Sequence, residues 1–113
     1  MSVATALAGE RRRREDTAGR LDNGLAALCR LVDIAKGDTG QSRRVADFLL
    51  AWWNAGSCGS FDLTNLWAVD SEIADDMMTV FRLVADRREY PTAYGLGDDF
   101  EQIVAAWRPE LLK

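Results

Sequence analysis

Apolar side chains recur at helical spacing along most of this sequence, and this feature most constrains the fold. Val45, Phe48, Leu49 and Trp52 occupy positions i, i+3, i+4 and i+7, which places them on one face of an α-helix. No sustained alternation of apolar and polar residues appears, so the pattern of a half-buried β-strand is missing. The sequence therefore predicts an all-α protein.

Four segments carry such an apolar face, and each is bounded by residues that start or stop helices. Ser42, Asp70 and Asp98 are good N-caps, because their side-chain oxygens accept hydrogen bonds from the first free amides of a helix. Gly37 and Pro91 end helices. We predict a small helical bundle of four main helices plus a short helical turn. The helices are expected at residues 21–36, 42–55, 71–88 and 98–108, and the turn after Asp62.

The chain has the length of one domain, and its first 20 residues differ from the rest. The 113 residues suffice to bury a core without disulfides or metal. Residues 1–20 show no periodic apolar face and hold a block of arginines. We therefore predict a flexible arginine-containing arm, or else a poorly anchored helix, over 1–20 and a helical domain over 21–113.

Four tryptophans are many for this length, and core packing accounts for most of them. Trp52, Trp67 and Trp107 fall on predicted apolar faces, so we expect them in the core. Trp53 directly follows Trp52, so it points about 100° away from it. An exposed Trp53 beside the flexible loop 56–60 would be a plausible anchor for a protein partner.

An acidic cluster lies between residues 62 and 76, a stretch without any basic residue. One interpretation is helix capping combined with a solvated helix face. The other is a partner-binding surface that meets a basic protein or imitates nucleic-acid phosphates. The predicted partner-binding residues are Trp53 and the five carboxylates of this cluster, Asp62, Asp70, Glu72, Asp75 and Asp76.

The charge distribution argues against direct nucleic-acid binding by the predicted domain. Residues 1–20 carry five arginines against three acidic residues, which leaves a net charge of −6 on the remainder of a chain whose total is −4. A nonspecific nucleic-acid binder usually shows the opposite sign. The run Arg11–Arg14 is either a solvated charge block or a contact to phosphates or to an acidic partner.

The residue types present remove several kinds of chemistry. Histidine is absent, so the commonest general base and the commonest metal ligand are both missing. We expect Cys29 to be a buried small thiol and Cys58 to be exposed in its loop, both free in a reducing cytoplasm. We expect no metal site, no cofactor and no membrane span, hence a cytoplasmic protein that is not an enzyme.

A resemblance to a known family rests on two segments. These are QSRRVADFLLAWWNAGSCGSFDLTNLWAVDSEIADDMMTVFRLVADRREYP, followed by FEQIVAAWRPEL. They resemble an uncharacterised family of short proteobacterial proteins, typical of integrative elements, plasmids and prophages. The resemblance covers about residues 25–112 and leaves out the arginine arm. It implies a setting among the accessory genes of mobile elements and assigns no activity or site residue.

The sequence thus predicts a non-enzymatic protein-interaction module, with the helical faces closing on one core and leaving no substrate cavity. In the mobile-element setting it would bind and inhibit or modulate a host protein complex, for example as an anti-CRISPR or other anti-defence inhibitor. One alternative is a small DNA-associated regulator with a helix-turn-helix around Gly37–Gln41. Another is a homodimeric structural protein that associates through Trp53.

Overall fold

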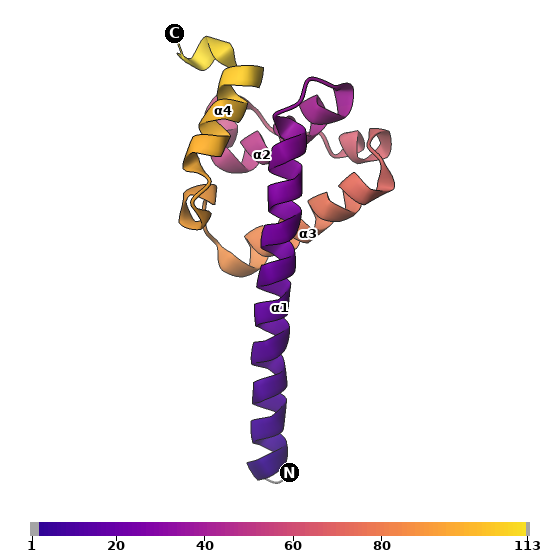
Figure 1. The fold of residues 1–113 in the computed structure, drawn as a ribbon, viewed down its shortest axis with the longest axis vertical. Helices are drawn as coiled ribbons and strands as arrows, with labels where there is room; N and C mark the ends of the chain where they lie inside the picture. Colours follow the sequence, from indigo (N-terminus) through magenta and orange to yellow (C-terminus); the bar gives the residue numbers. More distant parts are fainter. Residues whose placement is uncertain (1–2, 113) are drawn as a thin grey trace.

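The fold is a bundle of helices, as predicted. A computed structural model describes the backbone of residues 3–112 and the side chains of residues 19–112. The described chain contains no β-strand, and four α-helices dominate it (Figure 1). In chain order the elements are α1 (Val3–Ala35), α2 (Gly40–Cys58), η1 (Leu63–Ala68), α3 (Ser71–Arg87), η2 (Pro91–Tyr94), α4 (Gly97–Trp107) and η3 (Pro109–Leu112), the η elements being 3₁₀-helices.

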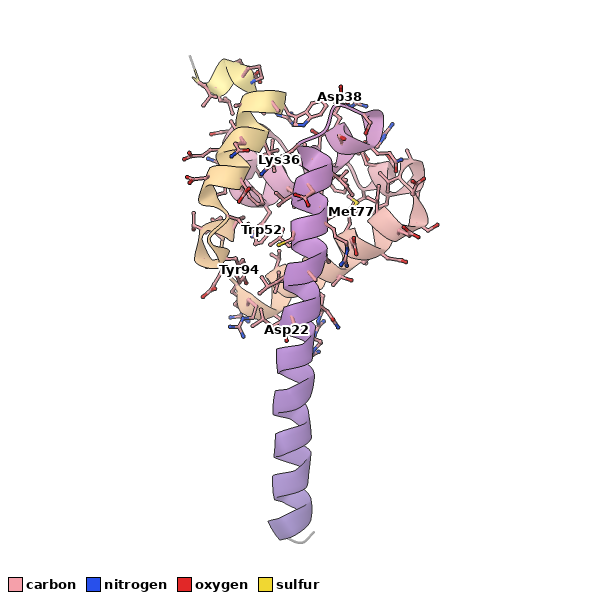
Figure 2. All side chains as sticks on the ribbon, in the orientation of Figure 1. Asp22, Lys36, Asp38, Trp52, Met77 and Tyr94 are labelled. Atoms are coloured by element: carbon pink, nitrogen blue, oxygen red, sulfur yellow. The ribbon has the colours of Figure 1, made fainter. Side chains whose placement is uncertain are left out.

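Helix α1 is both the centre of the bundle and its longest projection. Its C-terminal half is surrounded by α2, α3 and α4, whereas its N-terminal half runs out alone (Figure 1). The surrounding elements reach down to about Asp22 (Figure 2). With 33 residues, α1 is about 50 Å long at 1.5 Å per residue. The molecule measures 61 × 28 × 21 Å as a result. We call residues 3–20 the stalk.

The stalk corrects the expected start of the first helix. We expected that helix to begin near residue 21, but α1 begins at Val3. The stalk is rich in alanine, arginine and glutamate, which favour helix without any apolar face, and Glu10 precedes Arg14 by four residues, a stabilising spacing. The flexibility predicted for the arm stays a prediction. The side chains of Arg11–Arg14 lie outside the described residues.

The core forms where the four α-helices meet, and most predicted apolar faces supply it. Helix α1 makes most of its contacts with α3 and α2. Met77 of α3, for example, lies beside α1 (Figure 2). The buried apolar residues are Ala27, Leu28, Leu31, Val32, Ala35, Val45, Ala46, Leu49, Leu50, Cys58, Met77, Val80, Leu83, Phe100, Ile103 and Val104.

A glycine permits the close approach of α1 and α3. Gly24 is buried in α1, and a Cβ atom built on it would lie 3.2 Å from both Cβ and Cδ1 of Leu83. That separation is tighter than ordinary packing, so a side chain at position 24 would require Leu83 to shift by a few tenths of an ångström. Leu83 is itself 4% exposed, and the glycine therefore accounts for its burial.

Three tryptophans pack on the core, Trp52 and Trp107 as expected, and Trp53 although its position in the sequence made it a candidate for an exposed anchor. Trp52 and Trp53 are half-buried against Phe100, with ring centroids 6.0 Å and 5.3 Å away. Trp107 is also half-buried, and its Nε1 donates a 2.8 Å hydrogen bond to the carbonyl oxygen of Ala35 at the end of α1. These indoles connect α2 and α1 with α4.

Two large aromatic residues lie outside the core, and one of them, Trp67, was expected inside it. Trp67 is 85% exposed and Phe81 is 60% exposed. Successive residues of the 3₁₀-helix η1 are rotated by about 120°, so Trp67 points away from the side on which half-buried Leu66 packs on the core. Phe81 follows buried Val80 in α3, which turns its side chain about 100° from the core.

Two of the predicted N-caps are wrong by two or three residues. Thr39, not Ser42, caps α2, and its hydroxyl accepts a 3.0 Å hydrogen bond from the Ser42 amide. Helix α4 begins after Leu96 rather than after Asp98. The cap of η1 is as predicted, because Asp62 Oδ1 accepts a 2.9 Å hydrogen bond from the Thr64 amide.

The two cysteines exchange their expected environments. Cys29 is exposed on α1 and Cys58 is buried, and they are not bonded to each other. Helix α2 breaks at Asn54, where φ is −167°, and Asn54 Oδ1 accepts a hydrogen bond from the Ser57 amide. This capped final turn carries Cys58 into the core instead of leaving it in a loop.

Candidate protein interface

An open apolar groove lies between α2 and α3. Its volume is about 730 Å³, in the range of ligand and peptide clefts. The sequence did not indicate this groove, which is open to solvent and is not the enclosed substrate cavity whose absence was expected. We call this feature the α2–α3 groove. Its lining consists of Phe48, Ala51, Trp52, Phe61, Leu63, Phe81, Val84, Ala85, Arg88, Glu89 and Tyr90.

Aromatic contacts and one hydrogen bond position the groove walls. Phe48 and Phe61 pack edge to face with centroids 5.3 Å apart, which attaches the segment before η1 to α2. Arg88 ends α3 in the left-handed conformation, at φ 56° and ψ 40°, and so reverses the chain. Trp52 Nε1 then donates a 3.1 Å hydrogen bond to the Glu89 carbonyl. The segment after α3 is thus fastened to α2.

Large apolar side chains at the rim of the groove face solvent. Leu63 is 68% exposed and Tyr90 is 65% exposed. Phe81 has a similar exposure, and Trp67 and Met78 extend the apolar surface along η1 and α3. Single exposed apolar residues are ordinary, but a cluster around a groove is typical of an interaction surface.

The acidic cluster divides into engaged and open carboxylates. Asp62 caps η1, and hydrogen bonds from the Thr64 hydroxyl and amide lower the pKa of its carboxyl group. Asp70 accepts a hydrogen bond from Gln41 Nε2, which ties α3 to α2. Asp76 receives two hydrogen bonds from the guanidinium of Arg30, at 2.9 Å and 2.8 Å. These three carboxylates serve the fold.

Glu72 and Asp75 are the two members of the cluster that remain open. Both are exposed on α3, and no side-chain hydrogen bond to either occurs within residues 19–112. The predicted five-residue acidic surface is therefore reduced to one acidic edge at the beginning of α3. That edge lies on the same helix as Met78 and Phe81.

Trp53 does not have the exposure that a partner anchor requires. Its ring stacks on Phe100 at an interplanar angle of 29°, and it belongs to the packing around the core. Leu63, Trp67, Phe81 and Tyr90 were not predicted as surface residues. One signal was present for Phe81, since adjacent Val80 and Phe81 cannot both point at one core from a single helix.

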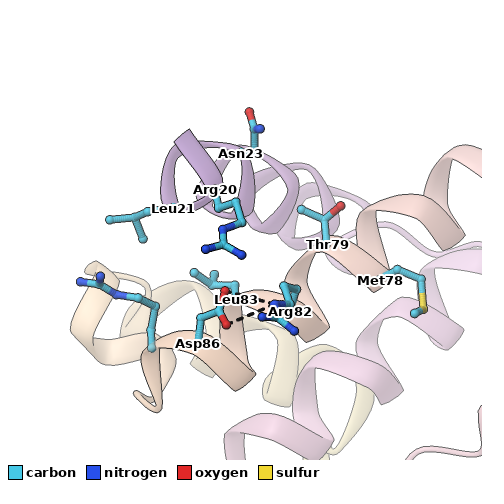
Figure 3. A pocket seen from close by; sticks show the side chains of 9 residues that line it. Arg20, Leu21, Asn23, Met78, Thr79, Arg82, Leu83 and Asp86 are labelled. Atoms are coloured by element: carbon cyan, nitrogen blue, oxygen red, sulfur yellow. Dashed lines mark hydrogen bonds and ion pairs between the residues drawn. The ribbon is translucent and has the colours of Figure 1, made fainter. Parts of the chain in front are cut away.

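A smaller hollow lies where the stalk leaves the bundle. It has a volume of about 320 Å³ between α1 and α3, and Figure 3 shows Arg20 above the pair formed by Arg82 and Asp86. Arg82 Nε lies 3.2 Å from Asp86 Oδ1. Arg87 completes the three guanidinium groups that line this α1–α3 pocket. The charge of this pocket is therefore positive, whereas the net charge of the bundle is negative.

Metal-binding and membrane-spanning features are not found in the described residues. Among them, no group of three or more Asp, Glu or Cys side chains converges as a metal site would require. No helix in that part of the chain combines the length and apolarity needed to cross a bilayer.

Thiol labelling provides a test of the unequal cysteines. Burial raises the pKa of the Cys58 thiol, which lowers its thiolate fraction near pH 8, and the side chain is 6% exposed. We expect Cys58 in the native protein to react with a maleimide at least about tenfold more slowly than Cys29. Mass spectrometry of tryptic peptides measures both rates, and Cys29→Ser isolates the slow one. Equal rates in native protein, or protection of Cys58 that survives in urea, would contradict the buried position.

The fold and the groove define a small all-α protein with an exposed apolar surface. The chain belongs to a family of unknown function, DUF7673, whose model matches residues 25–108. No curated protein and no solved structure matches the chain significantly. The matched residues include all of the α2–α3 groove and leave out the stalk.

Proposed function

We propose that this protein is a non-enzymatic protein-interaction module and that the α2–α3 groove is its docking surface. The observation that carries the proposal is the exposure of Leu63, Phe81 and Tyr90, each more than half accessible, around an apolar groove. Covering such side chains removes apolar area from water at about 25 cal/mol per Å². Tyrosine and tryptophan are also the residue types that dominate binding energy in interfaces.

The chemistry of the groove supports binding rather than catalysis. Arg88, Glu89 and Tyr90 are its ionisable lining residues, and all three are exposed at its edge. A catalytic acid–base pair usually needs groups held close together with shifted pKa values. The apolar floor formed by Phe48, Phe61 and Val84 suits the apolar face of a peptide or helix instead.

The family resemblance supports a finer version of the proposal. In the setting of integrative elements, plasmids and prophages, the protein would act in the cytoplasm as an accessory factor. It would bind a host protein complex and inhibit or modulate it. The most specific form of this proposal is an anti-CRISPR or other anti-defence inhibitor. Glu72 and Asp75 give the surface an acidic edge, which would favour a basic rim on the partner.

The test compares capture by the wild type with capture by matched surface variants. Tagged protein is expressed in its natural host and recovered at moderate salt, and co-purifying proteins are quantified by mass spectrometry. We expect one stoichiometric protein partner whose recovery falls at least about tenfold with Leu63→Asp, because a carboxylate would be buried in the groove. Gln102→Asp, at an exposed position of α4, is the control and should retain the partner.

Two results would count against the proposal. Equal recovery by wild type and Leu63→Asp would remove the groove from the interaction. Recovery of no protein, together with salt-sensitive DNA shifts in a gel, would favour the DNA-associated regulator. The observation that supports this second candidate is the α1–α3 pocket, with Arg20, Arg82 and Arg87 at the base of an arginine-containing stalk.

A further inference from the structure

Helix α3 carries two stripes of apolar side chains, and only one of them is buried in the core. Its inner face includes Met77, Val80 and Leu83, which are at most 4% exposed. A second stripe lies beside this face, rotated by roughly 130° about the helix axis, and recurs at steps of four, three and four residues, which is the spacing of a helix-to-helix seam. It consists of Ala74, Met78, Phe81 and Ala85. We call it the outer stripe.

The outer stripe stands as a ridge between two hollows. Met78 lines the α1–α3 pocket on one side, and Phe81 and Ala85 line the α2–α3 groove on the other. Met78 is 57% exposed and Phe81 is 60% exposed. Helices pack by setting ridges into grooves, so a ridge with hollows beside it is the shape that another helix can match.

The charges beside the outer stripe change sign along the helix. Asp75 flanks its beginning and Arg82 flanks the position seven residues later. Asp75 is exposed without a side-chain hydrogen bond in the described chain. Arg82 is 65% exposed, and within residues 19–112 its ion pair is the surface contact with Asp86, an exposed pair of little energetic weight. Both charges are therefore available to a docked helix.

We propose that the helix docked on the outer stripe is α3 of a second copy of this chain, in antiparallel orientation. This inference rests on the proposed function and names a first partner for the same surface. A two-fold axis passing between Met78 and Phe81 places Met78 of each copy against Phe81 of the other. Ala74 then meets Ala85, which keeps small residues opposite each other at both ends of the stripe.

The same symmetry brings opposite charges together. In the antiparallel arrangement Asp75 of each copy faces Arg82 of the other, so the contact is made twice. In a parallel two-fold pair, the edge that carries Asp75 and Arg82 would face the other edge of the partner helix, so these two charges would not meet each other. A foreign helix would need its own matched charges, whereas the second copy has them already. Self-complementarity is therefore what favours the second copy as occupant.

Charge reversal tests the pairing directly in purified, full-length protein. Asp75→Arg leaves positions 75 and 82 both basic and Arg82→Asp leaves them both acidic, so in each variant the charges that face each other across the seam repel. We expect sedimentation equilibrium at low salt to find a dimer for the wild type. Each single variant should have a dimer dissociation constant at least about tenfold higher, since both symmetric contacts are reversed.

Complementation separates a specific pairing from a general loss of association. An equimolar mixture of Asp75→Arg and Arg82→Asp should form a mixed dimer, and the double variant carrying both changes should recover the wild-type dimer. Glu101→Arg, an exposed reversal on α4, is the control and should associate like the wild type. Met78→Lys should weaken the dimer in every background, because it places a charge in the middle of the seam.

The outcomes also distinguish this inference from the proposed function. A wild-type protein that stays monomeric at millimolar concentration, or single variants that dimerise as well as the wild type, would overturn the second copy as occupant. A partner captured through Leu63 in that case would leave the proposed function standing. A dimer that follows the charge rules, with no foreign partner captured, would support self-association and count against a host target.

Discussion

Phe100→Ala is expected to lower the free energy of unfolding by about 3–5 kcal/mol, the range found when a buried phenylalanine is truncated. Phe100 is fully buried and stands between the two indoles that α2 presents to α4. Trp52 meets its ring edge to face at 90°, and Trp53 stacks on it. Removal of the ring would leave a cavity that two large, anchored indoles cannot fill without shifting.

Urea denaturation followed by tryptophan fluorescence measures this loss, since the two affected indoles report directly on the site. Glu101→Ala is the matched control, because residue 101 is the exposed neighbour on the same helix, and it should change stability by less than about 0.5 kcal/mol. Phe100→Leu should fall between the two. A loss below about 1 kcal/mol for Phe100→Ala would show that the Trp52–Phe100–Trp53 cluster does not hold α4 on the bundle.

Apolar periodicity was enough to predict the helices that pack on a core. The stripe Val45, Phe48, Leu49 and Trp52 placed α2 correctly, because only a helix brings those residues to one side. The stalk carries no such stripe and was predicted as an arm. Its helical state in α1 agrees with its residue propensities and with the Glu10–Arg14 spacing, neither of which appears in the apolar periodicity.

The candidate interface was not predictable because it depends on how each helix is rotated about its own axis. The apolar residues of α3 cover too wide an arc for one buried face. The sequence does not indicate that Phe81 is the residue left outside the core. The exposure of Trp67 depends on η1 being a 3₁₀-helix, because the rotation per residue in a 3₁₀-helix differs from that in an α-helix. Trp53 was considered as a surface anchor because its neighbour Trp52 was expected to face the core, but Phe100 contacts both indoles.

The roles of the charged residues in the acidic cluster were likewise not predictable from the sequence. The composition of the cluster was evident, but a carboxylate's role depends on the residue that reaches it from elsewhere in the chain. Asp76 is held by Arg30, which is 46 residues away in sequence. Asp70 is held by Gln41, which is 29 residues away. Glu72 and Asp75 meet no such partner in the described chain, so these two carboxylates of the cluster stay available to bind a partner.

Arg108→Ala is expected to cost about 2 kcal/mol of stability, the second largest effect of a single change. Its Nε donates a 2.9 Å hydrogen bond to the Cys58 carbonyl at the end of α2. One terminal nitrogen bonds the Trp107 carbonyl, and the other lies 2.7 Å from Asp47 Oδ1. The side chains of Arg108 and Asp47 are 22% and 25% exposed, so water screens the pair only in part.

The size of this effect follows from the number of acceptors that one guanidinium serves at once. Hydrogen bonds to charged groups contribute about 1.5–3 kcal/mol when partly buried. Arg108→Lys should recover less than half of the loss, because an ammonium lacks the planar fork that reaches all three oxygens. A thermal or urea double-mutant cycle with Asp47→Ala should give a coupling of about 1 kcal/mol. Additive losses, or full rescue by lysine, would mean that Arg108 acts through its aliphatic stem and does not join α2 to α4 by its charge.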